Sequence, residues 1–291
     1  MAFIQPRRSV LYMPGSNARA IEKARTLAAD ALILDLEDAV APESKTLARK
    51  QVCDAVKAGG FGKREIVIRV NGLWTEWGEE DLAAAVVAKP NAVLVPKVST
   101  ASDLQAIEER FAGHDPERQT MIWAMMETPL AILNAGQIAA AGGRLRCFVM
   151  GTNDLIKEFR GLHTPDRANL YAALGISVAA ARAYGLSILD GVYNDIPNAA
   201  GFLESCKQAK AFGFDGKTLI HPSQLAPCND VFAPSPAEVD SAKKIIAAFE
   251  LPENKGKGAI SLDGRMVELL HAEIARNTVA LADSIAALQD L

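Results

Sequence analysis

Two acidic residues that follow apolar runs give the strongest chemical signal in this chain. Glu127 follows the run 120–126, and Asp154 follows the run 147–150 and a short Gly-Thr-Asn segment. A spacing of strand, helix and strand would place both acids at the same end of neighbouring parallel strands, about 4.8 Å apart. Two carboxylates cannot share a dry cleft unless a proton or a cation lies between them.

A cation explains this pair better than a proton does. Two oxygen donors without a nearby His or Cys suit Mg²⁺, which keeps positions open for water and substrate oxygens. A shared proton would make the pair an acid/base dyad, but much negative charge would then remain, because other expected strands also end in acids. Glu37 and Asp38 could hold the water molecules of the ion. The strand ends together carry Glu37, Asp38, Arg69, Asn71, Lys97, Glu127, Asp154, Asp190 and His221.

Arg69 adds a guanidinium at the end of another apolar run. Its planar fork of donors suits a carboxylate or a developing enolate. A metal and an arginine at one site could hold a small oxo-acid through its carboxylate and carbonyl, and could stabilise enolate charge while a neighbouring C–C bond is made or broken. The residue types alone therefore predict Mg²⁺-dependent enolate chemistry.

Eight apolar runs that alternate with helical patterns must position these residues. The runs are continuously apolar, which is typical of strands buried on both faces of a parallel sheet. Eight repeats in 291 residues favour a (β/α)₈ TIM barrel, with the chemistry at the carboxyl ends of its strands. The expected strands are 8–13, 31–38, 65–72, 92–98, 120–126, 147–154, 187–190 and 217–220, and the expected helices are 17–28, 44–58, 79–88, 102–112, one after Pro129, 167–184, 198–212 and 236–249.

The chain continues beyond the expected barrel, which we place at residues 1–250. A glycine-rich connector at 253–258 precedes an extended piece at 259–262, an Asp-Gly turn and a last helix at 266–288. That helix has an apolar stripe that needs a surface to cover. We therefore expect residues 251–291 to form a connector and a helical arm that packs on its own barrel or on a neighbouring subunit.

Composition and charge exclude several classes of function. A formal net charge of -4 provides no basic face for nucleic acid. No apolar run approaches the roughly 20 residues that span a bilayer, and the first residues lack the apolar core of a signal peptide. The four scattered cysteines fit neither a zinc site nor a disulfide framework. We expect a cytoplasmic protein with reduced thiols and no membrane or nucleic-acid partner.

Short motifs at the strand ends resemble those of a known superfamily, the HpcH/HpaI aldolases and citrate lyases. The nearest resemblance is to the citrate lyase β-subunit-like branch, which includes malyl-CoA and citramalyl-CoA lyases, and it covers nearly the whole chain. The motifs are Arg8-Ser9-Val10-Leu11 with Pro14-Gly15, Asp35-Leu36-Glu37-Asp38-Ala39-Val40, Arg69-Val70-Asn71-Gly72, Pro96-Lys97, Glu127-Thr128, Gly151-Thr152-Asn153-Asp154-Leu155 and Ile220-His221-Pro222.

This resemblance implies a (β/α)₈ barrel with Mg²⁺ as its cofactor, acyl-CoA thioesters and small oxo-acids as substrates, and a homotrimer or hexamer. It implies Glu127 and Asp154 as metal ligands and Arg69 as the contact to the oxo-acid. The substrate-binding residues that it implies are Phe3, Arg8, Arg69, Glu127, Asn153, Asp154, Ile220 and His221, of which Phe3, Arg8, Ile220 and His221 contact coenzyme A in relatives.

An acid near the C-terminus completes the implied set. In relatives the C-terminal segment carries an aspartate, often in Gly-Lys-Met-Val-Asp, which reaches into a neighbour's site and handles the enolate. The matching run here is Gly-Arg-Met-Val-Glu at 264–268, so the acid is Glu268, which is one methylene longer. Asp263 is the nearest competing acid.

We therefore expect a Mg²⁺-dependent C–C lyase. It would cleave a 3-hydroxy-3-carboxyacyl-CoA, such as malyl-CoA or citramalyl-CoA, into an oxo-acid and an acyl-CoA by retro-Claisen chemistry. Arg69 would steady the oxo-acid, and Glu268 of a partner chain would protonate the enolate carbon. The alternatives are a thioesterase for the same compounds, a β subunit that works only within a citrate lyase complex, a pyruvate aldolase without coenzyme A, and a binding protein with weak activity.

Overall fold

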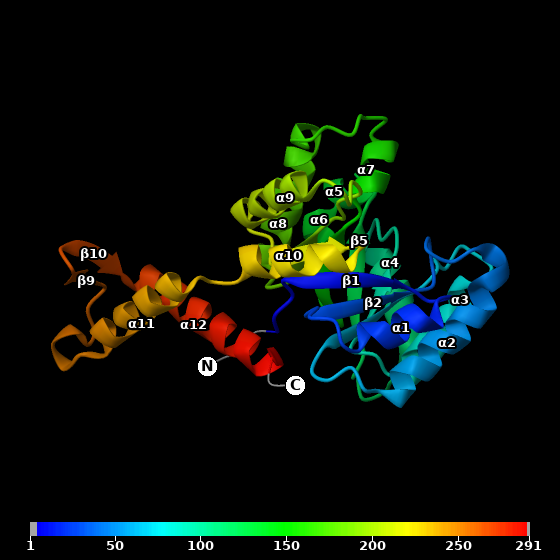
Figure 1. Cartoon of the computed structure of the whole chain (residues 1–291), viewed down its shortest axis with the longest axis horizontal. Helices are drawn as coiled ribbons and strands as arrows, with labels where there is room; N and C mark the ends of the chain where they lie inside the picture. Colours follow the sequence, from blue (N-terminus) through cyan, green and yellow to red (C-terminus); the bar gives the residue numbers. More distant parts are fainter. Residues whose placement is uncertain (1–4, 290–291) are drawn as a thin grey trace. The chain divides into compact units, whose positions relative to one another are not determined.

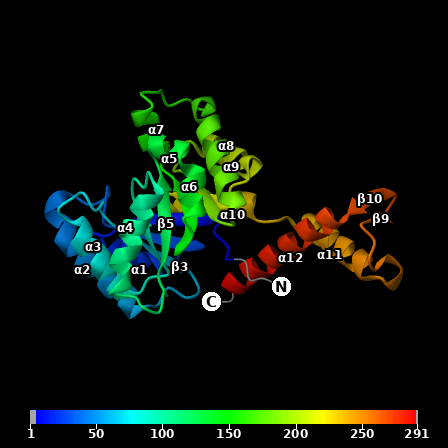
Figure 2. The ribbon, with the colours of Figure 1, turned by 180° about the vertical axis from the view of Figure 1, so that it is seen from behind.

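A computed structural model describes residues 5–289, which divide into two compact units (Figures 1 and 2). The larger unit comprises residues 7–229. The smaller comprises residues 230–289, with Gln5 and Pro6 grouped to it. The division falls after Asn229, whereas we expected it near residue 250. The helix that we expected to close the barrel, at 236–249, therefore groups with the C-terminal segment.

The larger unit contains a closed barrel of eight parallel strands, which confirms the predicted fold. Each strand pairs with the next, and β8 pairs with β1. The strands are β1 (Ser9–Pro14), β2 (Ala31–Asp35), β3 (Glu65–Arg69), β4 (Ala92–Val95), β5 (Met121–Met126), β6 (Leu145–Met150), β7 (Ser187–Asp190) and β8 (Gly216–Leu219).

Helices connect the strands and lie around them (Figure 1). They follow the predicted alternation except at 152–158 and 225–232, where the sequence analysis expected no helix. They are α1 (Ala18–Ala24), α2 (Lys45–Ala58), α3 (Gly78–Ala88), α4 (Ala101–Ala112), α5 (Pro129–Leu133), α6 (Ala135–Ala140), α7 (Thr152–Glu158), α8 (Tyr171–Ala183), α9 (Ala199–Phe212) and α10 (Leu225–Phe232).

The barrel is filled by side chains from alternate positions of its strands. Val10, Ile33, Trp123 and Val149 belong to one fully buried cluster, and Tyr12 packs against it. The intervening strand positions are also buried, because the surrounding helices cover the outer face. Burial on both faces explains why the strand sequences are continuously apolar.

The sixth strand ends earlier than the sequence analysis expected. β6 stops at Met150, and α7 begins at Thr152 after Gly151 as its N-cap residue. Asp154 therefore lies in the first turn of a helix, where the partial positive charge of the exposed backbone N–H groups favours an acid.

The C-terminal unit contains two helices that pack against each other, α11 (Pro236–Glu250) and α12 (Leu269–Gln289), and a hairpin of β9 (Ala259–Leu262) and β10 (Arg265–Glu268). The expected start of the last helix, at residue 266, is wrong because residues 265–268 pair with β9. Asp263 and Gly264 both have positive φ, at 50° and 77°. A two-residue hairpin loop with this backbone twists its strands in the favoured sense.

Two further findings concern the thiols and the helices. Cys53, Cys147, Cys206 and Cys228 are all buried free cysteines. Among residues 5–289, no helix combines the length and the apolar character needed to cross a bilayer.

Asp190 at the end of β7 is part of a buried ion-pair network. Lys217 Nζ lies 2.6 Å from one carboxylate oxygen and Arg167 Nη1 lies 2.8 Å from the other. The side chains of Asp190 and Lys217 are both inaccessible to solvent. This strand-end acid therefore has a structural role in the described chain.

Removing one member of this network should destabilise the barrel. We expect Lys217→Met to lower the free energy of unfolding by about 3–5 kcal/mol, because Asp190 stays buried with fewer partners. Urea denaturation followed by tryptophan fluorescence measures this, since all three Trp residues lie within 7–229. The matched control is Lys207→Met, in an exposed pair with Glu204, which should change stability by less than about 0.5 kcal/mol. Equal effects of the two variants would contradict this role.

The same network should contribute to acid sensitivity. Burial alone would raise the pKa of Asp190, but the charges and hydrogen bonds of Lys217 and Arg167 outweigh it and hold the pKa below its ordinary value. A lowered pKa stabilises the fold above about pH 4, and this contribution disappears as pH falls through the lowered value. As the pH falls from about 5 to about 3, Asp190→Asn should therefore lose less stability than wild type. Thermal unfolding midpoints of the two proteins across this range measure the difference.

Candidate active site

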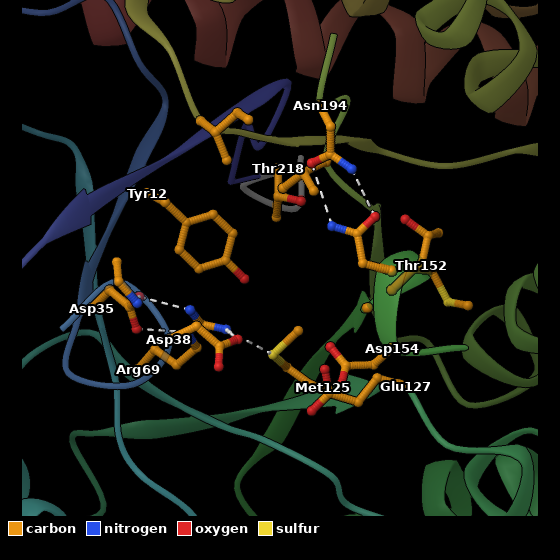
Figure 3. Close-up of a pocket in the computed structure, with 16 residues that line it drawn as sticks. Tyr12, Asp35, Asp38, Arg69, Met125, Glu127, Thr152, Asp154, Asn194 and Thr218 are labelled. Atoms are coloured by element: carbon orange, nitrogen blue, oxygen red, sulfur yellow. Dashed lines mark hydrogen bonds and ion pairs between the residues drawn. The ribbon is translucent and has the colours of Figure 1, made fainter. Parts of the chain in front are cut away.

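A cavity of about 300 Å³ opens at the carboxyl ends of the barrel strands. Figure 3 shows Tyr12, Asp35 and Arg69 along one side and Glu127 with Asp154 along another. The predicted position at this end of the barrel follows directly from the parallel strand order, because every strand delivers its last side chain to the same rim.

The two acids lie side by side because of the pairing between β5 and β6. Met126 is paired with Met150, so Glu127 and Gly151 are the next neighbours across the two strands. A Cβ on Gly151 would lie 2.4 Å from both the Cβ and Oε2 of Glu127. Only a residue without a side chain permits this approach, which leaves room for the Glu127 carboxylate beside Asp154.

Lys97, two residues after the carboxyl end of β4, lies close to both acids. Its backbone N–H donates to Oε1 of Glu127 over 2.8 Å, and its Nζ lies 3.9 Å from an Asp154 oxygen. Lys97 has a positive φ of 52°, which is uncommon for a residue with a side chain. This backbone conformation lets the main chain of Lys97 contact Glu127 while its side chain points to Asp154.

The acid pair has an unbalanced negative charge. Burial, followed by the charge of Asp154, raises the pKa of Glu127 to about 7, although Lys97 and Arg69 oppose this shift. A divalent cation would relieve the same repulsion, and two adjacent carboxylates suit an ion that takes its remaining ligands from water and substrate. No cluster of three or more His, Cys, Asp or Glu suited to a metal occurs within residues 5–289, so a cation here would have two protein carboxylates.

Arg69 is held rigidly at the other side of the cavity. Its Nε and Nη2 each lie 2.6 Å from an oxygen of Asp35, which forms a bidentate pair. Its Nη1 contacts Glu37 at 2.8 Å and Asp38 at 3.3 Å, and the guanidinium lies 4.8 Å from the centre of the Tyr12 ring. These contacts engage Nε, Nη1 and Nη2, and they fix the guanidinium in the wall of the cavity, where its positive charge faces the space that a ligand would occupy.

The loop that carries Glu37 and Asp38 is fixed by a buried lysine. Lys45 Nζ donates to the carbonyls of Leu36 and Glu37 at 2.8 and 2.7 Å and to the side-chain oxygen of Asn71 at 2.8 Å. Burial raises the pKa of Glu37 to about 8 in spite of Arg69, and nearby acids add to the shift. Asp38 lines the cavity. Glu37 does not line it, but it contacts Arg69, which does.

The structure places the remaining predicted contacts unevenly. Asn153 lines the cavity, and its side-chain amide exchanges two hydrogen bonds with that of Asn194. Ile220 also lines the cavity. His221 is exposed, and its ring bonds with Ser223 beyond the lining residues.

Arg8 does not line this cavity. It precedes β1, so it lies at the amino end of the barrel, where its guanidinium forms a buried ion pair with Asp30 at 2.8 Å. Its contact with coenzyme A stays a prediction. Phe3 lies outside the described residues. Glu268 ends β10 in the C-terminal unit.

Sequence reasoning missed several lining residues, namely Tyr12, Asp35, Asn194 and Thr218. Alternation along the strands could have found the first two. Tyr12 has the same parity as Val10, and Asp35 the same parity as Ile33, and both of these core residues point into the barrel. No comparable signal marks Asn194, which lies in a loop after β7.

The sequence profile of the HpcH/HpaI aldolase/citrate lyase family matches residues 8–222. The chain belongs to this family. It is 51% identical over 284 residues to a (3S)-malyl-CoA thioesterase of Cereibacter sphaeroides, covering 98% of this chain and 97% of that protein. It is 38% identical over 268 residues to the citrate lyase subunit beta of Escherichia coli, covering 90% and 88% of the two chains.

A solved structure of similar fold agrees with this family assignment. Protein CitE from Mycobacterium tuberculosis, crystallised in complex with magnesium, acetoacetate and coenzyme A, superposes with a TM-score of 0.76. The two chains are 28% identical, and the match covers 94% of this family member and 97% of CitE.

A side chain at position 151 should damage the acid pair. Gly151→Ala would force its Cβ against Glu127, so we expect binding of Mg²⁺, measured by isothermal titration calorimetry, to weaken by roughly tenfold or more. Gly175→Ala in α8 is the matched control, because a Cβ there meets nothing within 4 Å. A Gly151→Ala variant that binds Mg²⁺ like wild type would show that the carboxylates do not form a cation site.

Proposed function

We propose that this chain is a magnesium-dependent enzyme that acts on CoA thioesters of the malyl-CoA type. The observation that carries the proposal is the pair Glu127 and Asp154 facing a fixed Arg69 across one cavity. Carboxylates supply ligands for a hard cation, and the guanidinium supplies a partner for the carboxylate of a small oxo-acid. One relative named above is a (3S)-malyl-CoA thioesterase, and CitE is crystallised with magnesium, acetoacetate and coenzyme A, which supports this proposal.

Mg²⁺ held by Glu127 and Asp154 would supply Lewis-acid polarisation of substrate oxygens. The chain's own residues prepare the site for this ion and for the substrate. Lys97 fixes Glu127 through its backbone N–H. Glu37 and Asp38 lie beside Arg69, where they would hold water molecules near the ion, and Lys45 keeps their loop in place.

The reaction that we favour is cleavage of the C–C bond of a 3-hydroxy-3-carboxyacyl-CoA. Loss of the proton from the 3-hydroxyl group lets its oxygen form a carbonyl while the bond to the CoA-bearing fragment breaks. Malyl-CoA would give glyoxylate and acetyl-CoA. Arg69 would hold the oxo-acid, and a protein acid would return a proton to the carbon of the acyl-CoA enolate.

Hydrolysis of the thioester is the second candidate. The observation in its favour is the 51% identity, over nearly the whole of both chains, to the (3S)-malyl-CoA thioesterase. In this reaction water adds to the thioester carbonyl, and malyl-CoA would give malate and free coenzyme A. A β subunit that acts only within a citrate lyase complex, which the 38% relative suggests, would instead leave the purified chain inactive on free thioesters.

Product analysis separates these reactions. We expect the purified chain with Mg²⁺ to convert malyl-CoA to glyoxylate and acetyl-CoA, whereas malate and free coenzyme A would assign it as a thioesterase; mass spectrometry distinguishes the products. Asp154→Ala should lower turnover by roughly 10³-fold or more, because one of two metal ligands is lost. Asp54→Ala, which removes an exposed acid of α2, is the control. Full turnover in EDTA would refute the metal-dependent proposal.

We also propose that the C-terminal unit serves a neighbouring subunit of a homotrimer or hexamer. Met266, Leu270 and Ile274 of this unit are more than half exposed, at 71%, 55% and 55%. Apolar side chains grouped on one short segment are typical of a surface that another chain covers. Glu268, within this segment, would then provide the acid that protonates the enolate in the neighbour's cavity.

Mixing two inactive variants tests this arrangement. Glu268→Gln and Asp154→Asn should each be nearly inactive, whereas subunits exchanged between them should recover roughly a quarter of the wild-type sites, because a site can combine an intact barrel with an intact neighbouring arm. Turnover of malyl-CoA after mixing measures the recovery. Full activity of Glu268→Gln alone, or no recovery on confirmed subunit exchange, would contradict a shared site.

A further inference from the structure

Tyr12 lines the cavity on the same side as Arg69, and neither the proposed metal ligands nor Arg69 explains its presence there. It pairs with Ile33 of β2 and points into the barrel, as Val10 does two residues earlier. Its ring rests on the buried core cluster, and its hydroxyl end is directed into the cavity (Figure 3). A tyrosine in such a position buries its apolar ring and presents its polar tip to whatever fills the space.

The ring is held in place on a second side. The Arg69 guanidinium lies 4.8 Å from the ring centre, and Asp35 fixes that guanidinium through two hydrogen bonds. The phenol therefore has little freedom to turn away from the cavity. Burial raises the pKa of Tyr12 above its ordinary value, so the hydroxyl keeps its proton across the physiological range.

Three other polar side chains around the cavity are already engaged. Thr218 donates its hydroxyl to the carbonyl of Asp190, and the amides of Asn153 and Asn194 bond to each other. Within residues 5–289, the Tyr12 hydroxyl makes no hydrogen bond to another protein group. Glu127, Asp154 and Asp38 are acceptors when ionised, so an anionic ligand needs donors such as Arg69 and this phenol.

We propose that the Tyr12 hydroxyl donates a hydrogen bond to an anionic oxygen of the bound oxo-acid. This inference rests on the proposed function, and it adds a contact that selects ligands by charge and position. An oxo-acid between the acid pair and Arg69 would lie next to the phenol, so that one of its carboxylate oxygens accepts this hydrogen bond. The thioester end of the substrate would not depend on this contact.

The test removes one oxygen atom. Tyr12→Phe keeps the ring against Arg69 and the core, so the variant should fold with an unchanged melting temperature. In the presence of Mg²⁺, calorimetric titration with pyruvate and glyoxylate should show affinity lowered roughly tenfold, as expected for a lost hydrogen bond to a charged acceptor. Affinity for acetyl-CoA should be unchanged. Tyr184→Phe is the matched control, since Tyr184 ends α8 at the other end of the barrel and is exposed.

The outcomes separate this inference from the proposed function. If wild type turns over malyl-CoA while Tyr12→Phe keeps wild-type affinity for both oxo-acids, the inference alone is overturned. Equal weakening of oxo-acid and acetyl-CoA binding with a lower melting temperature would assign Tyr12 a merely structural role and would also overturn it. A wild-type chain that neither binds oxo-acids nor turns over thioesters would overturn the proposed function and this inference with it.

Discussion

Repulsion between two carboxylates in a buried cleft is the constraint around which this barrel end is arranged. Glu127 and Asp154 are brought together by the pairing of β5 with β6, and among residues 5–289 the cation nearest to Asp154 is Lys97, whose Nζ approaches it only to 3.9 Å. Such a pair is stable only when it shares a proton or binds a cation. The raised pKa of Glu127 expresses the first solution, and the cavity beside it leaves space for the second.

On the opposite side of the cavity, a cation is surrounded by acids. Arg69 is surrounded by three acids, and Asp35 alone fixes its orientation with two short hydrogen bonds. The cavity thus has a fixed guanidinium on one side and an unsatisfied acid pair on the other. A small molecule with a carboxylate next to a second oxygen would be attracted to the guanidinium, and it could approach the acid pair only through a divalent cation.

Much of this arrangement could be predicted from the sequence, for a physical reason. Short continuous apolar runs that alternate with helical patterns favour strands buried on both faces, and parallel strands in a closed barrel have their carboxyl ends at one rim. The rest depended on details that runs do not encode. Asp35 and Glu37 are both acids near the end of β2. Which of them forms the bidentate pair with Arg69 depends on strand alternation and on the loop that Lys45 holds. The helix expected from residue 266 is wrong over residues 266–268, because the pairing of β10 with β9, which local sequence does not encode, makes this segment a strand.

The absence of a side chain at residue 151 has a consequence for how this site can diversify. Backbone pairing, and not the packing of side chains, sets how closely residue 151 approaches Glu127, so exchanges in more distant loops leave this approach unchanged. Such exchanges can alter which ligand enters the cavity while Glu127 keeps its position. Family members can then differ in the loops that control entry to the cavity, while the paired backbone of β5 and β6 stays the same.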